Sequence, residues 1–262
     1  MIQCEFYNDS YYHIKGETMT GIYQIADKNV QITTAYHYFH KIYDAYRVTS
    51  YSDFAITTSK AEIEAARKNV KEEAIIDGNS LRELPEPYVE TLLVRNKIAE
   101  KMPKYNSVFI HGSTLAVDGK GILFIARNGI ASHSYCKLWQ DYFGKRAEII
   151  NHDISFIHAD NRKIKVYSTP WGNVNRIEKN VSFDLHTVCI LDLSKRIRVE
   201  SFDTVNASTL FLQKCYRPVH RLSRQKSISV IQTVIENASL YTLHVDMNRE
   251  NVKTVYDAMQ WL

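Results

Sequence analysis

One segment of the sequence gathers basic, imidazole and hydroxyl side chains where an apolar strand is expected to turn into a helix. It follows the apolar run at 121–126 and consists of Arg127, Asn128, Gly129, Ile130, Ala131, Ser132, His133 and Ser134. A strand, a loop and a helix are also the setting of the phosphate-binding pattern G-x-x-x-x-G-K-[ST]. In that pattern backbone N–H groups surround phosphate oxygens, a lysine offsets their charge and a hydroxyl holds magnesium.

The match to this pattern is incomplete. Ala126 and Ala131 take the glycine positions, Ser132 takes the lysine position and His133 takes the position of the magnesium-binding hydroxyl. Taken by itself, the segment therefore favours an ordinary strand-to-helix turn around Gly129.

The blocks around this segment resemble a known family in their order and spacing. They read HGSTLAVDGKGILF at 111–124, KLWQDYFG at 137–144, EIINHD at 148–153 and STPWGN at 168–173. The region resembles the kinase domain of HPr kinase/phosphorylase. It looks closer still to bacterial proteins that resemble both that kinase and ATP-dependent phosphoenolpyruvate carboxykinase. The resemblance covers 85–262 well and 1–80 loosely.

The resemblance implies an α/β fold of the P-loop kinase type, with a mixed central sheet flanked by helices and a smaller β-rich N-terminal part. We place the boundary between residues 80 and 81, which gives a β-rich region at 1–80 and the kinase-like domain at 81–262. The resemblance also implies roles for three parts of the chain: 127–134 as nucleotide site, Asp153 as base or metal ligand, and His111 beside the phosphate acceptor.

The departures from the family pattern argue against ordinary ATP-dependent phosphoryl transfer. The loop lysine is absent, the Cβ of Ala131 would crowd a phosphate, and His152 stands where the group often has an acidic residue. Losing even one preorganised donor typically costs about 10²- to 10³-fold in rate. We therefore expect a catalytically degenerate binding or regulatory module that requires no cofactor. A peptide or protein partner is suggested by the resemblance alone.

Two alternatives remain open. In the first, the chain is an active phosphotransferase of the serine or peptide kinase type that uses ATP and magnesium. Arg127 and backbone amides would then hold phosphate, Asp153 would be the base or metal ligand, and His111 or His133 would assist. In the second, His133, His152 and Asp153 converge on a transition metal, a ligand set that such metals accept.

The elements that must position these residues alternate between strands and helices, which indicates the α/β class. Alternating residues predict strands at 21–34, and Ser59 with Glu62 predicts a capping box at the start of a helix. An amphipathic helix is expected at 86–102. The segment 147–159 is expected to form a strand pair or one long strand.

Other residues with chemical potential have simpler interpretations. Trp139 and Trp171 are expected to be core anchors, and Cys136 is expected to be buried beside Trp139 rather than activated by the helix N-terminus. The basic segment at 217–226 is expected to be solvated surface, with binding of an acidic or phosphorylated partner as the alternative.

Composition limits the classes of protein to which the chain can belong. The chain has 262 residues, of which 45% are hydrophobic, and its formal net charge of +4 does not by itself argue for nucleic acid. Its four cysteines show no C-x-x-C spacing, and its longest apolar run is too short to span a bilayer. Because the N-terminus also lacks the pattern of a signal peptide, we expect a cytoplasmic protein that binds neither membrane nor nucleic acid.

Overall fold

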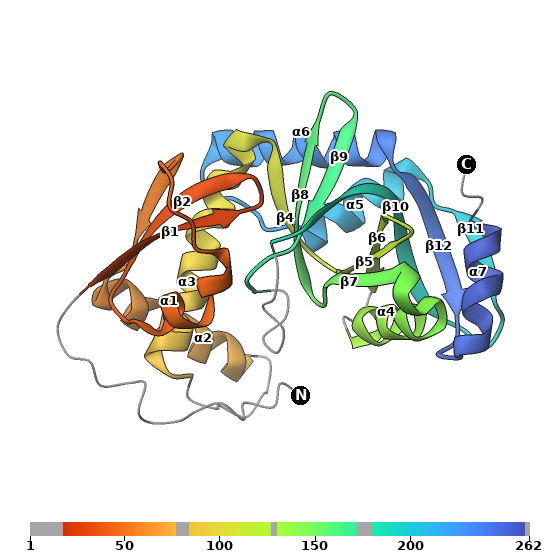
Figure 1. The fold of residues 1–262 in the computed structure, drawn as a ribbon, viewed down its shortest axis with the longest axis horizontal. Coiled ribbons are helices and arrows are strands. Elements are labelled where there is room, and N and C mark those ends of the chain that lie inside the picture. Colours follow the sequence, from red (N-terminus) through yellow and green to blue (C-terminus); the bar gives the residue numbers. More distant parts are fainter. Residues whose placement is uncertain (1–17, 77–83, 127–129, 172–179, 260–262) are drawn as a thin grey trace. The chain divides into compact units, whose positions relative to one another are not determined.

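The computed structural model describes residues 18–76, 84–126, 130–171 and 180–259. The chain forms two compact units, Met1–Ile98 and Ala99–Leu262, and their elements are drawn in Figure 1. None of the described helices is both long and apolar enough to cross a membrane.

The first unit is built on a three-stranded sheet. Its elements are β1 (Met19–Ile25), β2 (Lys28–Thr34), α1 (Tyr38–Ile42), the 3-10 helix η2 (Asp44–Tyr46), β3 (Phe54–Thr57), α2 (Lys60–Ile76) and α3 (Glu86–Lys101). β2 lies between β1, to which it is antiparallel, and β3, to which it is parallel. The strands predicted at 21–34 are confirmed, whereas α1 and η2 interrupt a stretch that was expected to be β-rich throughout.

The capping box predicted at the start of α2 is present. The backbone N–H of Ser59 donates to Glu62 Oε2 over 3.0 Å, and the N–H of Glu62 donates to Ser59 Oγ over 3.4 Å. These two bonds satisfy donors that have no partner within the helix, which fixes where α2 begins.

Helix α3 belongs to the first unit for most of its length, because that unit ends at Ile98. The boundary predicted between residues 80 and 81 would place this helix in the second domain, whereas the compact units divide after Ile98. Glu90, which has no exposed surface, ties α3 to the first unit. Its carboxylate accepts hydrogen bonds from the N–H groups of Ala35 and Tyr36 and from the hydroxyl of Thr58, at 2.7, 3.0 and 2.5 Å.

The second unit contains a nine-stranded mixed sheet. Its strands are β4 (Ser107–His111), β5 (Ser113–Val117), β6 (Lys120–Ala126), β7 (Ala147–Asn151), β8 (Ile154–Asp160), β9 (Lys163–Tyr167), β10 (Ser182–Leu193), β11 (Arg198–Ser201) and β12 (Ser239–Val245). The main path runs β4-β8-β9-β10-β6-β5-β7, and β12 pairs with β10 and β11. β6, β10 and β12 are mutually parallel, while the other pairs are antiparallel.

Helices cover both faces of this sheet. They are α4 (Ile130–Phe143), α5 (Thr204–Lys214), α6 (Arg221–Asn237) and α7 (Val252–Ala258), with short 3-10 helices η3 (Met102–Tyr105), η4 (Gly144–Arg146) and η5 (Arg249–Asn251). On one face Phe124 packs in a core with Trp139 of α4 and Val255 of α7. On the other face Leu123 packs in a core with Ile231 of α6. The expected α/β architecture, a mixed sheet flanked by helices, is therefore confirmed (Figure 1).

Gly112 separates β4 from β5. β4 ends before it and pairs with β8, whereas β5 begins after it and pairs with β6 and β7. A Cβ at Gly112 would lie 2.8 Å from a methyl group of Leu123 and 2.9 Å from the carbonyl oxygen of Phe124. Only glycine fits this crossing between strands. The segment 147–159 forms two strands, which settles the alternative left open above.

Candidate functional site

The candidate site lies where β6 passes into α4. β6 ends at Ala126 and α4 begins at Ile130. Arg127, Asn128 and Gly129 lie outside the described residues, as do the side chains of Ile130 and Ala131. The geometry of the site therefore comes from the first turn of α4 and from the strand ends beside it.

Ser132, at the position that a phosphate-binding loop reserves for lysine, packs into the interior. Its side chain is 3% exposed, and its hydroxyl oxygen is hydrogen-bonded to Ser113 Oγ on β5 at 2.9 Å. The Ser113 hydroxyl also donates to the backbone carbonyl of His152. Helix, strand and turn are thus joined by short polar side chains.

His133 and His152 lie against each other beside this packed serine. Their ring centroids are 4.1 Å apart with the planes at 77°. Loss of hydration around the ring lowers the pKa of His133, the charge of Lys137 lowers it further, and Asp153 opposes both. A lowered pKa favours the neutral imidazole, which can both donate and accept a hydrogen bond.

The two candidate catalytic residues lie at adjacent strand ends. His111 ends β4 directly opposite Ile154, the first residue of β8, and the N–H of Gly112 donates to the carbonyl oxygen of Asp153 over 2.7 Å. The side chains of His111 and Asp153 are both exposed. The structure therefore brings His111, Asp153 and the pair of histidines to one end of the sheet.

These residues do not form a recognisable metal centre. Among the described residues, no group of three or more His, Cys, Asp or Glu side chains is arranged to hold a metal ion. The rings of His133 and His152 are in contact and the charge of Asp153 acts on His133, but the three side chains are not arranged as a metal-ligand set.

A buried polar network beneath the site was not anticipated from the sequence. Its centre is Asn151, which is 1% exposed. Its amide donates to Ser155 Oγ and to the carbonyl of Tyr167, both over 2.9 Å, and to Thr114 Oγ1 over 3.3 Å. Its amide oxygen accepts from the N–H of Thr169 over 2.9 Å. The available signal was the run of Ser and Thr at strand positions where alternation would place apolar side chains.

The remaining candidates have structural roles. Trp139 and Trp171 are buried, as expected, with 0% and 8% of their surface exposed. Cys136 is fully buried too, and that burial raises the pKa of its thiol far above the usual range. This thiol is therefore not activated by its place near the start of α4.

The basic segment at 217–226 is used partly to fix its own backbone. Arg224 Nε donates to the carbonyl of Pro218 over 3.0 Å, and Arg217 Nε donates to the carbonyl of Leu212 over 3.1 Å. Glu100 accepts from the N–H groups of Val219 and His220, each over 2.8 Å. These bonds hold the turn between α5 and α6.

Comparison with known proteins gives a distant likeness among solved structures. No model of a protein family matches the chain, and no curated protein does either. Among solved structures, the chain is similar to the HPr(Ser) kinase/phosphatase from Coxiella burnetii, at 12% sequence identity and a TM-score of 0.27. The matched region covers 47% of this chain and 93% of that chain.

Proposed function

We propose that this chain is a catalytically degenerate relative of HPr kinase and phosphoenolpyruvate carboxykinase that acts as a binding or regulatory module. The observation that carries the proposal is the buried hydrogen bond between Ser132 and Ser113. A working loop needs a mobile cation that can reach the β and γ phosphates. A short hydroxyl packed against β5 supplies neither the charge nor the reach.

The network around Asn151 supports the same proposal. Its donors and acceptors satisfy one another, so these side chains are not directed toward a substrate. A fully satisfied buried network rigidifies the structure around it. Such a site is better suited to holding a surface in one shape than to closing on a nucleotide.

A peptide or protein is the partner class that we propose, on the resemblance alone. The exposed side chains of His111 and Asp153 at the strand ends and of His133 in the first turn of α4 offer both hydrogen-bond donors and acceptors to such a partner. Nothing in this arrangement calls for a cofactor.

The test is magnesium-dependent nucleotide chemistry. Purified protein is incubated with ATP or GTP and magnesium, and phosphate release is measured against a buffer blank. We expect turnover at the level of the blank, in wild type and in the Arg127→Ala variant alike. Turnover well above the blank that Arg127→Ala abolishes would show that the loop is a working nucleotide site.

A second candidate function, an atypical phosphotransferase, is favoured by one observation. The rings of His133 and His152 lie in contact and the charge of Asp153 acts on His133, so an imidazole and a carboxylate stand together beside the loop. This candidate predicts turnover that Asp153→Asn removes. Asp160→Asn, which neutralises an exposed carboxylate at the other end of β8, is the matched control.

A further inference from the structure

A second site candidate lies at the opposite end of β6, where β10 changes partners. The first residues of β10 pair with β9 up to Asp184, and pairing with β12 begins only at Thr187. β6 holds the other edge of β10 along this stretch. β9 and β12 thus diverge like a fork, and a cavity of about 580 Å³ opens between them.

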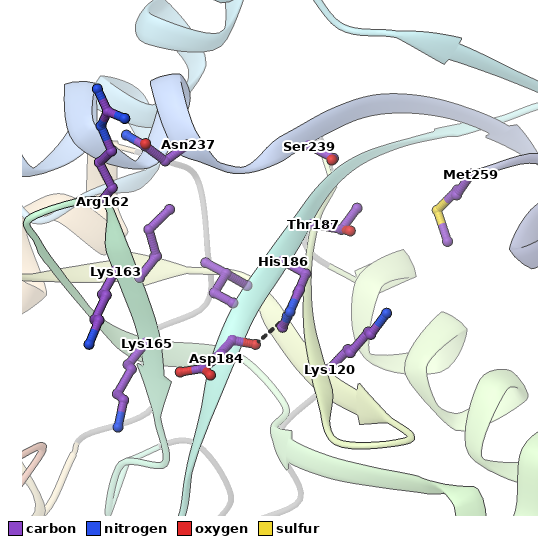
Figure 2. A pocket seen from close by; sticks show the side chains of 12 residues that line it. Lys120, Arg162, Lys163, Lys165, Asp184, His186, Thr187, Asn237, Ser239 and Met259 are labelled. Atoms are coloured by element: carbon purple, nitrogen blue, oxygen red, sulfur yellow. Dashed lines mark hydrogen bonds between the residues drawn. The ribbon is translucent and has the colours of Figure 1, made fainter. Parts of the chain in front are cut away.

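The side chains around this fork are mainly cationic. Lys163 and Lys165 stand two residues apart on β9 and so project from the same face of the sheet. Asp184 lies in register with Lys165 on one side and with Lys120 of β6 on the other, as Figure 2 shows. Arg162 also lines the cavity and extends in the opposite direction from Lys163 and Lys165 in Figure 2, so the lining as a whole holds four cationic residues and one carboxylate.

Three of these four cationic side chains form no ion pair within the described part of the chain. No described carboxylate lies within ion-pair distance of Arg162, Lys163 or Lys165. Like charges that lie close together repel each other. An anion in the cavity would remove that repulsion.

Arg162 occupies a backbone position that favours glycine. It is the second residue of the two-residue turn between β8 and β9, where Asn161 and Arg162 have φ values of +47° and +67°. Such turns prefer glycine at this second position, because side chains are disfavoured at positive φ. A strained residue that adds charge to a cavity rim is typical of a functional constraint.

The fork also has neutral donors and a suitable size. Thr187, Asn237 and Ser239 line it together with His186, which stands at an irregularity in the pairing of β10 with β6. Irregularities of this kind are frequent beside binding sites. A volume of about 580 Å³ falls within the range of small-molecule sites.

We propose that this cavity binds a small phosphate-bearing molecule through Arg162, Lys163 and Lys165. The seven residues of β6 separate it from the loop before α4, a distance of about 20 Å from the rise of a strand. It is therefore a different site from the one discussed above.

The first test uses pyrophosphate as the probe, titrated into the full chain by calorimetry at constant ionic strength. We expect saturable binding that becomes at least about ten-fold weaker in the double variant Lys163→Gln/Lys165→Gln, since two charge-assisted bonds are lost. The control is Lys195→Gln/Arg196→Gln, which removes the same charge from exposed positions beyond the other end of β10. Equal weakening in both double variants, or no binding to wild type, overturns the proposal.

The second test separates binding from structural effects. Arg162→Gly relieves the turn, so we expect a higher melting temperature together with weaker pyrophosphate binding. An unchanged affinity in this variant contradicts the proposal. Arg127→Ala should leave pyrophosphate binding unchanged. Loss of pyrophosphate binding in Arg127→Ala would show that the anion binds at the loop before α4 instead.

Discussion

The variant Ser132→Lys tests whether the position that a phosphate-binding loop gives to lysine can accommodate a lysine side chain in this protein. The substitution removes the hydrogen bond to Ser113, which is worth about 1 kcal/mol. It also forces a longer side chain into a position that is 3% exposed, at a typical cost of about 1–3 kcal/mol. The free energy of unfolding should therefore fall by about 2–4 kcal/mol.

The assay is thermal unfolding followed by circular dichroism. For a unit of this size, such a loss lowers the melting temperature by roughly 5–15 °C. Ser134→Lys is the matched control, because it places the same residue in the same helix at an exposed position. We expect that control to stay within about 0.5 kcal/mol of wild type. If Ser132→Lys is as stable as Ser134→Lys, the lysine position is open and the reasoning fails.

Three further predictions concern buried polar groups. Asn151→Asp places a carboxylate among three buried acceptors and should cost about 3–5 kcal/mol in urea unfolding at neutral pH; a cost below 1 kcal/mol would show that the network contributes little. Burial lowers the pKa of His40, which is hydrogen-bonded to Tyr23, to about 4. Its contribution to stability is therefore complete above pH 6.5 and lost as the pH falls toward 4, by about 2 kcal/mol between pH 7 and pH 5. His40→Gln should remove that part of the pH dependence, and an unaltered dependence would contradict the assignment. Burial raises the pKa of Glu90, and Glu90→Gln, which removes one acceptor, should cost about 1–3 kcal/mol, whereas the exposed control Glu64→Gln should cost almost nothing.

The sequence predicted the local features of the fold well. The capping box of Ser59 and Glu62, the strands at 21–34 and the helix at 86–102 depend on neighbouring residues, so short-range patterns determine them. For 147–159 the sequence left two alternatives, a pair of strands or one long strand, and the pair is the one found. The placement of α3 with the first unit depends on the buried carboxylate of Glu90, which no periodicity reveals.

The roles predicted for the site residues stay predictions. The convergence of His133, His152 and Asp153 was left open as one alternative, and the structure shows a contact between the rings of His133 and His152. The burial of Ser132 against Ser113 was not predicted, because it depends on the separate path that β5 takes after Gly112. The cationic fork was missed for a related reason. Lys120 and Lys165 come together only through the pairing of β10 with strands distant in sequence.

The most direct measurement of the central claim is a site-resolved nucleotide titration. The protein is labelled with ¹⁵N serine and histidine, and the amide signals of Ser132, His133 and Ser134 are followed by NMR as ATP and magnesium are added. We predict no saturable shift of these signals up to about 5 mM ATP, a concentration above the usual range for enzyme substrates. A magnesium-dependent, saturable shift of Ser132 and His133 would show that nucleotide occupies the loop, and the degenerate-site account would be wrong.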